Sequence, residues 1–232
     1  MLAPLHQDQA YHRFADSRAL LGIPNFADVV SSVVLVLIGI LGIWLLWRNP
    51  AGRFSGAEEW RAYWWFFCAV AATGIGSAYY HLAPDDARLA WDRLPIAVAC
   101  MCLLGAIVAE RLRIAPGGTL LAVLALLGAA SVLYWMVFDD LRPYVLVQFG
   151  SILAIVVLAA WLPSRYSHGW LIFAVAALYA LAKWCEFRDP VIYELTGRTV
   201  SGHTLKHLLS AAAVGALLWW VSFRQVGSAG HG

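Results

Sequence analysis

Residues 27–47 read ADVVSSVVLVLIGILGIWLLW, an almost unbroken apolar stretch in which Asp28 is the only charged residue. A helix needs about 20 mostly apolar residues to cross the hydrocarbon core of a bilayer. Six further windows of the same kind follow, at 62–82, 93–110, 118–138, 144–162, 169–187 and 203–223. The apolar runs are continuous rather than alternating, which favours helices over the strands of a membrane barrel. The sequence therefore predicts an all-α integral membrane protein, a seven-transmembrane helix bundle.

The composition of the whole chain agrees with this prediction. Of its 232 residues, 62% are hydrophobic and only 13% are charged, whereas about a quarter of the residues of soluble domains are charged. So little polar surface excludes a soluble enzyme and a disordered tail. The net charge of +2 with no basic run also excludes a nucleic-acid binder, because no phosphate-binding surface is present.

The seven windows leave no room for a separate soluble domain, so we expect residues 1–232 to form one multi-pass membrane domain. Residues 1–26 are polar and lack the basic-then-apolar pattern of a cleaved signal peptide, so the first span is expected to be retained. Residues 224–232, which end in GSAGHG, are expected to form a flexible tail. Basic residues are nearly balanced between the two faces, so the positive-inside rule leaves the orientation open. No obligate protein partner is evident.

Ionisable side chains gather at one end of the predicted bundle. A charged or titratable residue in a transmembrane segment is costly, so it marks a functional site by default. In a seven-span topology, the end of window 62–82 and the starts of windows 93–110 and 203–223 lie on one face. The polar residues brought to this face are Ser77, His81, Asp92, His203 and His207.

The spacing of these residues is typical of a metal site. His203 and His207 are four residues apart, so both imidazoles project from one face of a helix. Ser77 precedes His81 by the same interval. Three neutral imidazoles with one open position form the ligand set of a catalytic zinc, whose bound water is acidic. Asp92 is placed to accept a proton from that water or to hold its second hydrogen.

Two of these residues also have structural interpretations. Ser77 follows Gly74 and Gly76, and small residues let membrane helices pack closely. Asp92 precedes Pro95, so it is a possible helix N-cap with proline in the first turn.

On these residues the chain resembles the alkaline ceramidases and their superfamily of seven-helix membrane hydrolases. That superfamily includes adiponectin-receptor-like proteins and glycosylphosphatidylinositol-lipid remodelling proteins. The shared pattern is a serine four residues before a histidine, an aspartate opening the third helix, and His-xxx-His on the seventh. The ceramidase branch is most similar in the segments Gly76-Ser77-x-x-Tyr80-His81 and Asp92-Arg-Leu-Pro95.

The resemblance implies a zinc-dependent amidase that works within the membrane. Its substrate partner would be a membrane lipid, a ceramide-like N-acyl sphingoid lipid, which it would split into a fatty acid and a sphingoid base. By resemblance, Zn²⁺ is bound by His81, His203 and His207. Asp92 would activate the attacking water, and Ser77 would hydrogen-bond the developing oxyanion or that water.

The resemblance also raises the question of calcium. Animal members of the family carry an acidic Ca²⁺-binding cluster just before the first helix. The corresponding stretch keeps Asp16, Asn25 and Asp28 as ligands, fewer than the six to eight oxygens that Ca²⁺ prefers. The alternative is that Asp28 caps the first helix.

Three further residues are expected near the site. Lys206 stands between the two histidines, where the animal enzymes have an aromatic residue. Its ammonium group either contacts a lipid headgroup or substrate carboxylate, or extends to the interface. Glu186 either hydrogen-bonds a zinc-binding histidine or pairs with Lys183 or Arg188. Tyr80, next to His81, is a further candidate for contacts to the histidines or the headgroup.

Other functions remain open. The protein could be a seven-helix lipid receptor or binding protein with a structural zinc. It could also be an amidase for another N-acyl lipid, such as an N-acyl amino acid or N-acyl ethanolamine. A retinal photoreceptor is disfavoured, because a Schiff-base lysine lies in mid-membrane whereas Lys206 is within about one turn of the predicted helix start.

Overall fold

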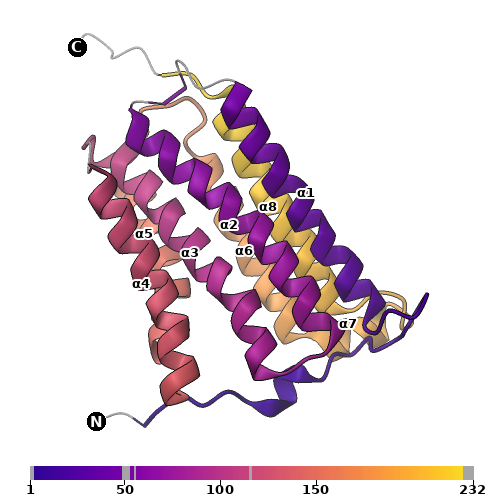
Figure 1. The fold of residues 1–232 in the computed structure, drawn as a ribbon. Coiled ribbons are helices and arrows are strands. Elements are labelled where there is room, and N and C mark those ends of the chain that lie inside the picture. Colours follow the sequence, from indigo (N-terminus) through magenta and orange to yellow (C-terminus); the bar gives the residue numbers. More distant parts are fainter. Residues whose placement is uncertain (1–2, 49–52, 55, 115–116, 227–232) are drawn as a thin grey trace.

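The computed structural model describes residues 3–48, 53–54, 56–114 and 117–226. These residues form eight α-helices and no strand (Figure 1). The helices are α1 (Phe26–Arg48), α2 (Ala57–Leu82), α3 (Asp86–Arg111), α4 (Gly117–Phe138), α5 (Arg142–Trp161), α6 (Leu171–Phe187), α7 (Asp189–Leu195) and α8 (Gly202–Phe223). A short 3-10 helix, η1 (Gln9–His12), precedes α1. The prediction of an all-α protein is confirmed for the described residues.

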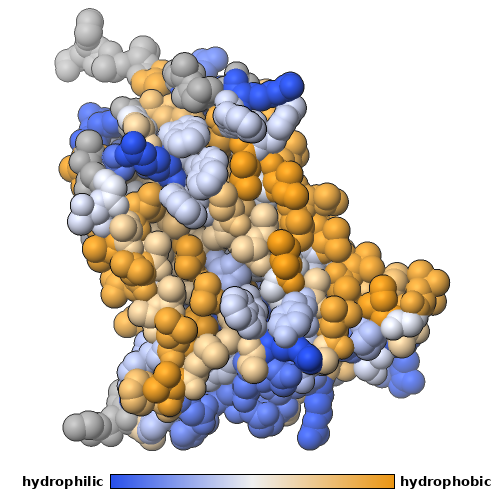
Figure 2. Space-filling model, in the orientation of Figure 1, coloured by the Kyte–Doolittle hydropathy of each residue, from blue (hydrophilic) through white to orange (hydrophobic). Residues whose placement is uncertain are grey.

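Five of the described helices, α1, α3, α4, α5 and α8, are long and apolar enough to cross a membrane. Figure 2 shows hydrophobic side chains over much of the middle of the visible face and hydrophilic ones toward its two ends. Both observations fit a multi-pass membrane protein. The windows at 62–82 and 169–187 are helical, but α6 has only 17 residues and α2 opens with charged residues. Seven spans are therefore not confirmed.

Helix α2 lies between α1 and α3, and α8 packs against α1 and α6 (Figure 1). Two glycines of α2 allow this close approach. A Cβ atom on Gly76 would lie 2.1 Å from the carbonyl oxygen of Trp91 in α3, and one on Gly74 would lie 2.7 Å from that of Ser32 in α1. Only glycine fits at such contacts with backbone. The glycines thus bring α1 and α3 against α2 at the level of Ser77.

The N-terminal segment crosses the end of the bundle at which α2 ends and α8 begins (Figure 1). Its backbone is held at two places: the Ala15 amide donates to Asp189 of α7 at 2.9 Å, and the Leu5 amide donates to Asp140 at 3.2 Å. This segment therefore covers the residues that end α2 and begin α8.

The opposite end of the bundle is closed by a buried ion pair. The guanidinium of Arg224 donates to Glu59 at 2.6 Å, and both side chains are at most 1% exposed. The Arg224 guanidinium also lies 3.8 Å from the centre of the Tyr166 ring. Residues 224–226, expected to be part of a flexible tail, are instead anchored, because Gln225 exchanges hydrogen bonds with Ser167. The remainder of that tail, 227–232, lies outside the described residues.

We expect Arg224→Met to lower the free energy of unfolding by about 3–5 kcal/mol, because it breaks the buried ion pair with Glu59 by removing one partner. The measurement is thermal or denaturant unfolding in detergent. Arg198→Met is the matched control, because Arg198 pairs with Glu194 at the surface and exposed pairs contribute at most about 1 kcal/mol. Equal stability of the two variants would contradict a structural role for the buried pair.

Candidate metal centre

The three predicted histidines converge at one end of the bundle. His81 comes from the last turn of α2, and His203 and His207 come from the first two turns of α8. All three are buried, and their candidate ligand nitrogens lie within 4.8 Å of one another. The ring centres are 4.8 Å (81–203), 5.1 Å (81–207) and 5.1 Å (203–207) apart. Two nitrogens bound to one tetrahedral zinc at about 2.1 Å are about 3.4 Å apart, so the imidazoles would move slightly closer together to share an ion.

The hydrogen bonding of His81 fits a metal ligand. This residue is fully buried, yet neither Nδ1 nor Nε2 has a hydrogen-bond partner among the described residues. Buried polar atoms are rarely left unpaired, and a metal ion would satisfy one of these nitrogens. Phe14 of the N-terminal segment packs over His81 and His203, with ring centres 4.6 and 4.7 Å away, and so helps keep water from the cluster. The group can therefore hold a metal ion; the identity of that ion is not shown.

A serine of α1 orients His207. The Ser31 hydroxyl lies 2.8 Å from His207 Nδ1 and 3.1 Å from the carbonyl oxygen of Asp28. The carbonyl can only accept, so the hydroxyl donates its single proton there and accepts from Nδ1–H of the imidazole. This hydrogen-bond network assigns the neutral tautomer in which His207 Nε2 carries a lone pair. That nitrogen lies 3.3 Å from Ser77 Oγ.

We expect Ser31→Ala to weaken metal binding about 10- to 100-fold, the usual effect of removing the partner that orients a metal-binding histidine. The measurement is competition for zinc against a chelator of known affinity. Ser131→Ala is the control, because the Ser131 hydroxyl likewise bonds a carbonyl of its own helix but contacts no histidine. Unchanged zinc affinity in Ser31→Ala would show that His207 does not depend on this bond.

The surroundings of His203 are more polar than those of His81. Its backbone amide donates to Asp189 at 2.8 Å, which ties the start of α8 to α7. The ammonium of Lys206 lies 2.9 Å from His203 Nε2 and donates to Glu186 at 2.8 Å. A cation so close to the imidazoles opposes a bound metal ion by charge repulsion, and the carboxylate offsets that charge.

Glu186 is the centre of a small polar network. It pairs with Lys183 and with Lys206, and it accepts a hydrogen bond from the Tyr11 hydroxyl at 2.8 Å. Burial, together with the negative charge of Glu186, raises the pKa of Tyr11 well above its usual range, so this phenol stays protonated. The expected ion pair with Lys183 is confirmed. The link from Glu186 to His203 passes through Lys206.

Tyr80 lies beside His81 and is hydrogen-bonded to the N-terminal segment. Its hydroxyl bonds His12 Nδ1 at 2.9 Å, and His12 Nε2 in turn bonds Asp86 at 3.1 Å. Its ring lies beside that of His81, with centres 5.0 Å apart. His12 of the N-terminal segment therefore joins the end of α2 to the start of α3.

Asp92 lies inside α3 and not at its beginning. The N-cap of α3 is Asp85, whose side chain accepts from the Arg88 amide at 2.7 Å. The N-cap interpretation of Asp92 is therefore wrong: the helix starts more than a turn earlier, and Pro95 is inside it. The carboxylate is 96% buried and lines the same cavity as Ser77 and His207. A buried carboxylate at a cavity is placed for proton transfer.

Ser77 is hydrogen-bonded to residues of α1 and α8. Its hydroxyl lies 3.0 Å from that of Ser32 in α1 and 3.3 Å from His207 Nε2 in α8. The close-packing interpretation holds for Gly74 and Gly76, while Ser77 itself faces the histidines. The cavity beside it has apolar walls contributed by several helices, including Leu35, Phe66, Val175 and Leu217.

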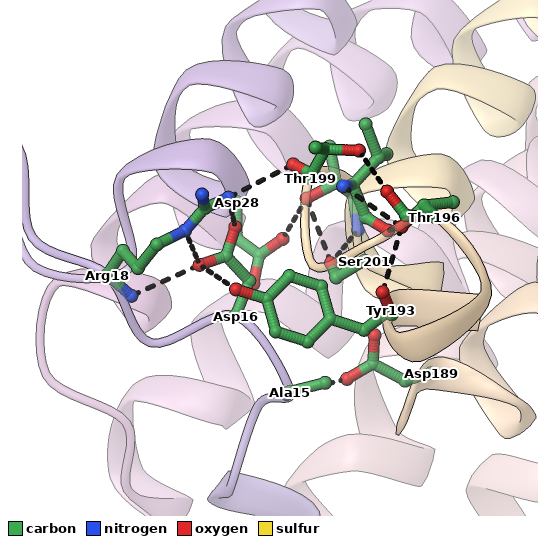
Figure 3. A network of polar contacts seen from close by, with 11 residues as sticks. Ala15, Asp16, Arg18, Asp28, Asp189, Tyr193, Thr196, Thr199 and Ser201 are labelled. Atoms are coloured by element: carbon green, nitrogen blue, oxygen red, sulfur yellow. Dashed lines mark hydrogen bonds and ion pairs between the residues drawn. The ribbon is translucent and has the colours of Figure 1, made fainter. Parts of the chain in front are cut away.

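The three candidate calcium ligands already have protein partners. Both carboxylate oxygens of Asp16 accept from Arg18 at 2.7 Å, and these bonds lower the pKa of Asp16. The side-chain amide of Asn25 donates to the carbonyl of His81 at 2.8 Å. Asp28 accepts from Thr204 at 2.7 Å, so it links α1 to α8 and is not a simple cap. Figure 3 shows Asp16 and Asp28 in one network with Arg18 and Thr199. Calcium binding stays a prediction, and Arg18 supplies a positive charge at Asp16.

Some residues around the histidines were not anticipated from the sequence. Ser31 and Ser32 are polar residues within a mostly apolar window, and such residues in a membrane segment are candidates for a functional site. Phe14 gives no such signal, because its contact depends on the path of the N-terminal segment.

In comparisons with known proteins, no family model matches the chain, and no curated protein matches it.

Proposed function

We propose that the protein is an intramembrane zinc-dependent amidase that hydrolyses the amide bond of ceramide-like N-acyl lipids. The observation that carries the proposal is the convergence of three buried histidines beside a cavity lined by Asp92 and by apolar side chains. The proposal also follows the resemblance to the alkaline ceramidases, whose motif positions are the residues brought together. A membrane lipid supplies both an amide and a long apolar chain, which suits such a cavity.

Each residue has a chemical role in this proposal. Zn²⁺ bound by His81, His203 and His207 would supply a Lewis acid and lower the pKa of a water molecule. The Asp92 carboxylate accepts a proton from the attacking water and returns it to the leaving amine nitrogen. The Ser77 hydroxyl donates a hydrogen bond to the carbonyl oxygen as negative charge develops there.

The apolar side chains of the cavity hold the acyl chain and exclude bulk water. Low water content strengthens every polar interaction within the site. Because α2 and α6 lie beside the five apolar helices, we extend the proposal to seven membrane spans. The histidines would then lie near one membrane face, at the depth of an amide just below the lipid headgroups.

The test is fatty-acid release, measured by mass spectrometry, from a panel of N-palmitoyl lipids incubated with the detergent-purified protein. Zinc content is measured in the same preparation. The inhibitor arm uses 1,10-phenanthroline, and 1,7-phenanthroline, which does not chelate, serves as its control. Release that the chelator abolishes and added zinc restores would support the amidase.

Two results would overturn the proposal. Bound zinc without fatty-acid release from any lipid would favour a receptor or lipid-binding protein in which the metal is structural. Fatty-acid release from a protein without zinc would show that the histidines do not work through zinc.

A further inference from the structure

A buried arginine lines the cavity next to Asp92. Arg93 of α3 is 93% buried, and its guanidinium is a cation with five N–H donors and no acceptor. Among the described residues, its Nη1 atom has no hydrogen-bond partner and no carboxylate forms an ion pair with it. Asp92, the preceding residue of α3, lines the same cavity and acts on this charge electrostatically, but it forms no ion pair with Arg93.

Three aromatic rings surround this guanidinium. It lies 4.5 Å from the ring centre of Trp135, 5.1 Å from that of Tyr144 and 5.4 Å from that of Tyr11. Cation–π contacts contribute about 0.5–2 kcal/mol each, whereas burying an unpaired charge costs several kcal/mol even after relaxation. The rings orient the guanidinium but do not replace a counter-ion.

The cavity as a whole is also positive. Its lining contains Arg93, Lys183 and Lys206 against Asp92 and Glu186. Glu186 already pairs with both lysines, and Asp92 is assigned to proton transfer in the proposed function. Arg93 is therefore the cation of the cavity lining that is available to bind an anionic ligand. The planar arrangement of its N–H donors matches the oxygen atoms of an oxyanion.

We infer that the lipid substrate carries an oxyanion close to its scissile amide, and that Arg93 binds this group. The chemical class is an acidic N-acyl lipid, with a carboxylate, sulfonate or phosphate near the amide nitrogen. The inference rests on the proposed amidase for its choice of an amide lipid. It keeps the N-acyl amide of the proposed function but replaces the neutral ceramide-like headgroup with an acidic one.

The experiment compares two lipids that differ only at this group, N-palmitoylglycine and N-palmitoylethanolamine, with ceramide as a neutral reference. The wild-type protein should prefer N-palmitoylglycine in kcat/KM. Arg93→Gln should lower that preference about 10- to 100-fold, the range expected for a hydrogen-bonded charge. Arg113→Gln, an exposed position beyond the far end of α3, is the matched control and should leave it unchanged.

A second readout does not depend on turnover. Binding of the same two lipids to chelator-treated, metal-free protein is followed by tryptophan fluorescence. Selective binding of N-palmitoylglycine that is lost in Arg93→Gln would support the acidic-lipid site even if no lipid were hydrolysed, in which case only the proposed amidase would fail.

Two outcomes would overturn the inference. Hydrolysis of ceramide or N-palmitoylethanolamine as fast as N-palmitoylglycine, with no change of preference in Arg93→Gln, would leave the amidase intact and Arg93 structural. Palmitate binding as tightly as N-palmitoylglycine, without preference between the two amides as substrates, would assign Arg93 to the carboxylate of the fatty-acid product.

Discussion

His81→Ala is expected to reduce bound zinc from about one ion per chain to background, because catalytic zinc sites use three protein ligands and only two imidazoles would remain. Fatty-acid release should fall by more than about 100-fold, since even the loss of a residue that only orients a ligand costs about 10- to 100-fold. His81 is the most informative of the three histidines, because neither of its ring nitrogens has a hydrogen-bond partner in the part of the chain that the structure describes, so its substitution breaks no side-chain hydrogen bond there.

The measurements are metal content by mass spectrometry and fatty-acid release in the same preparation. His6→Ala is the matched control, since His6 is 64% exposed and contacts Asp139 at the surface. Both proteins should melt at similar temperatures once zinc is removed from the control. If His81→Ala retained stoichiometric zinc, the metal centre would have to be placed elsewhere.

Much of the fold could be predicted from the sequence, because the length of each apolar run can be counted in the sequence alone. All seven expected windows are helical, and the histidines on α2 and α8 meet because helix periodicity puts 203 and 207 on one face. The helix starts were less predictable. The charged turns that open α2 and α3 extend these helices beyond their apolar windows, so the apolar pattern alone places Asp92 at a helix start although it lies inside α3.

The surroundings of the histidines could be predicted only in part. Contacts between residues 31 and 207, or 14 and 81, depend on how helices far apart in the sequence come together, and local pattern does not specify that. The burial of Arg93 at a cavity depends on the same contacts between helices. The tail was expected to be flexible from its glycines, but residues 224–226 are held by Glu59 and Ser167, which lie far away in the sequence.

Asp92→Asn should lower fatty-acid release about 10²- to 10⁴-fold, the usual contribution of a general base, while the protein keeps its zinc. The amide has nearly the shape of the carboxylate, so the packing of α3 against Gly76 of α2 is preserved. It cannot accept the proton of the attacking water. Loss of turnover with full zinc content thus separates proton transfer from metal binding, which His81→Ala cannot do.

Asp139→Asn is the control for this substitution, because that carboxylate is 63% exposed and lies outside the cavity lining. Release within about twofold of wild type in Asp92→Asn would exclude Asp92 as the base. Loss of zinc together with activity would instead make Asp92 a residue that holds the histidines in place. In either case the base would have to be sought elsewhere in the cavity, where Glu186 is the other buried carboxylate of the lining and is already engaged by two lysines.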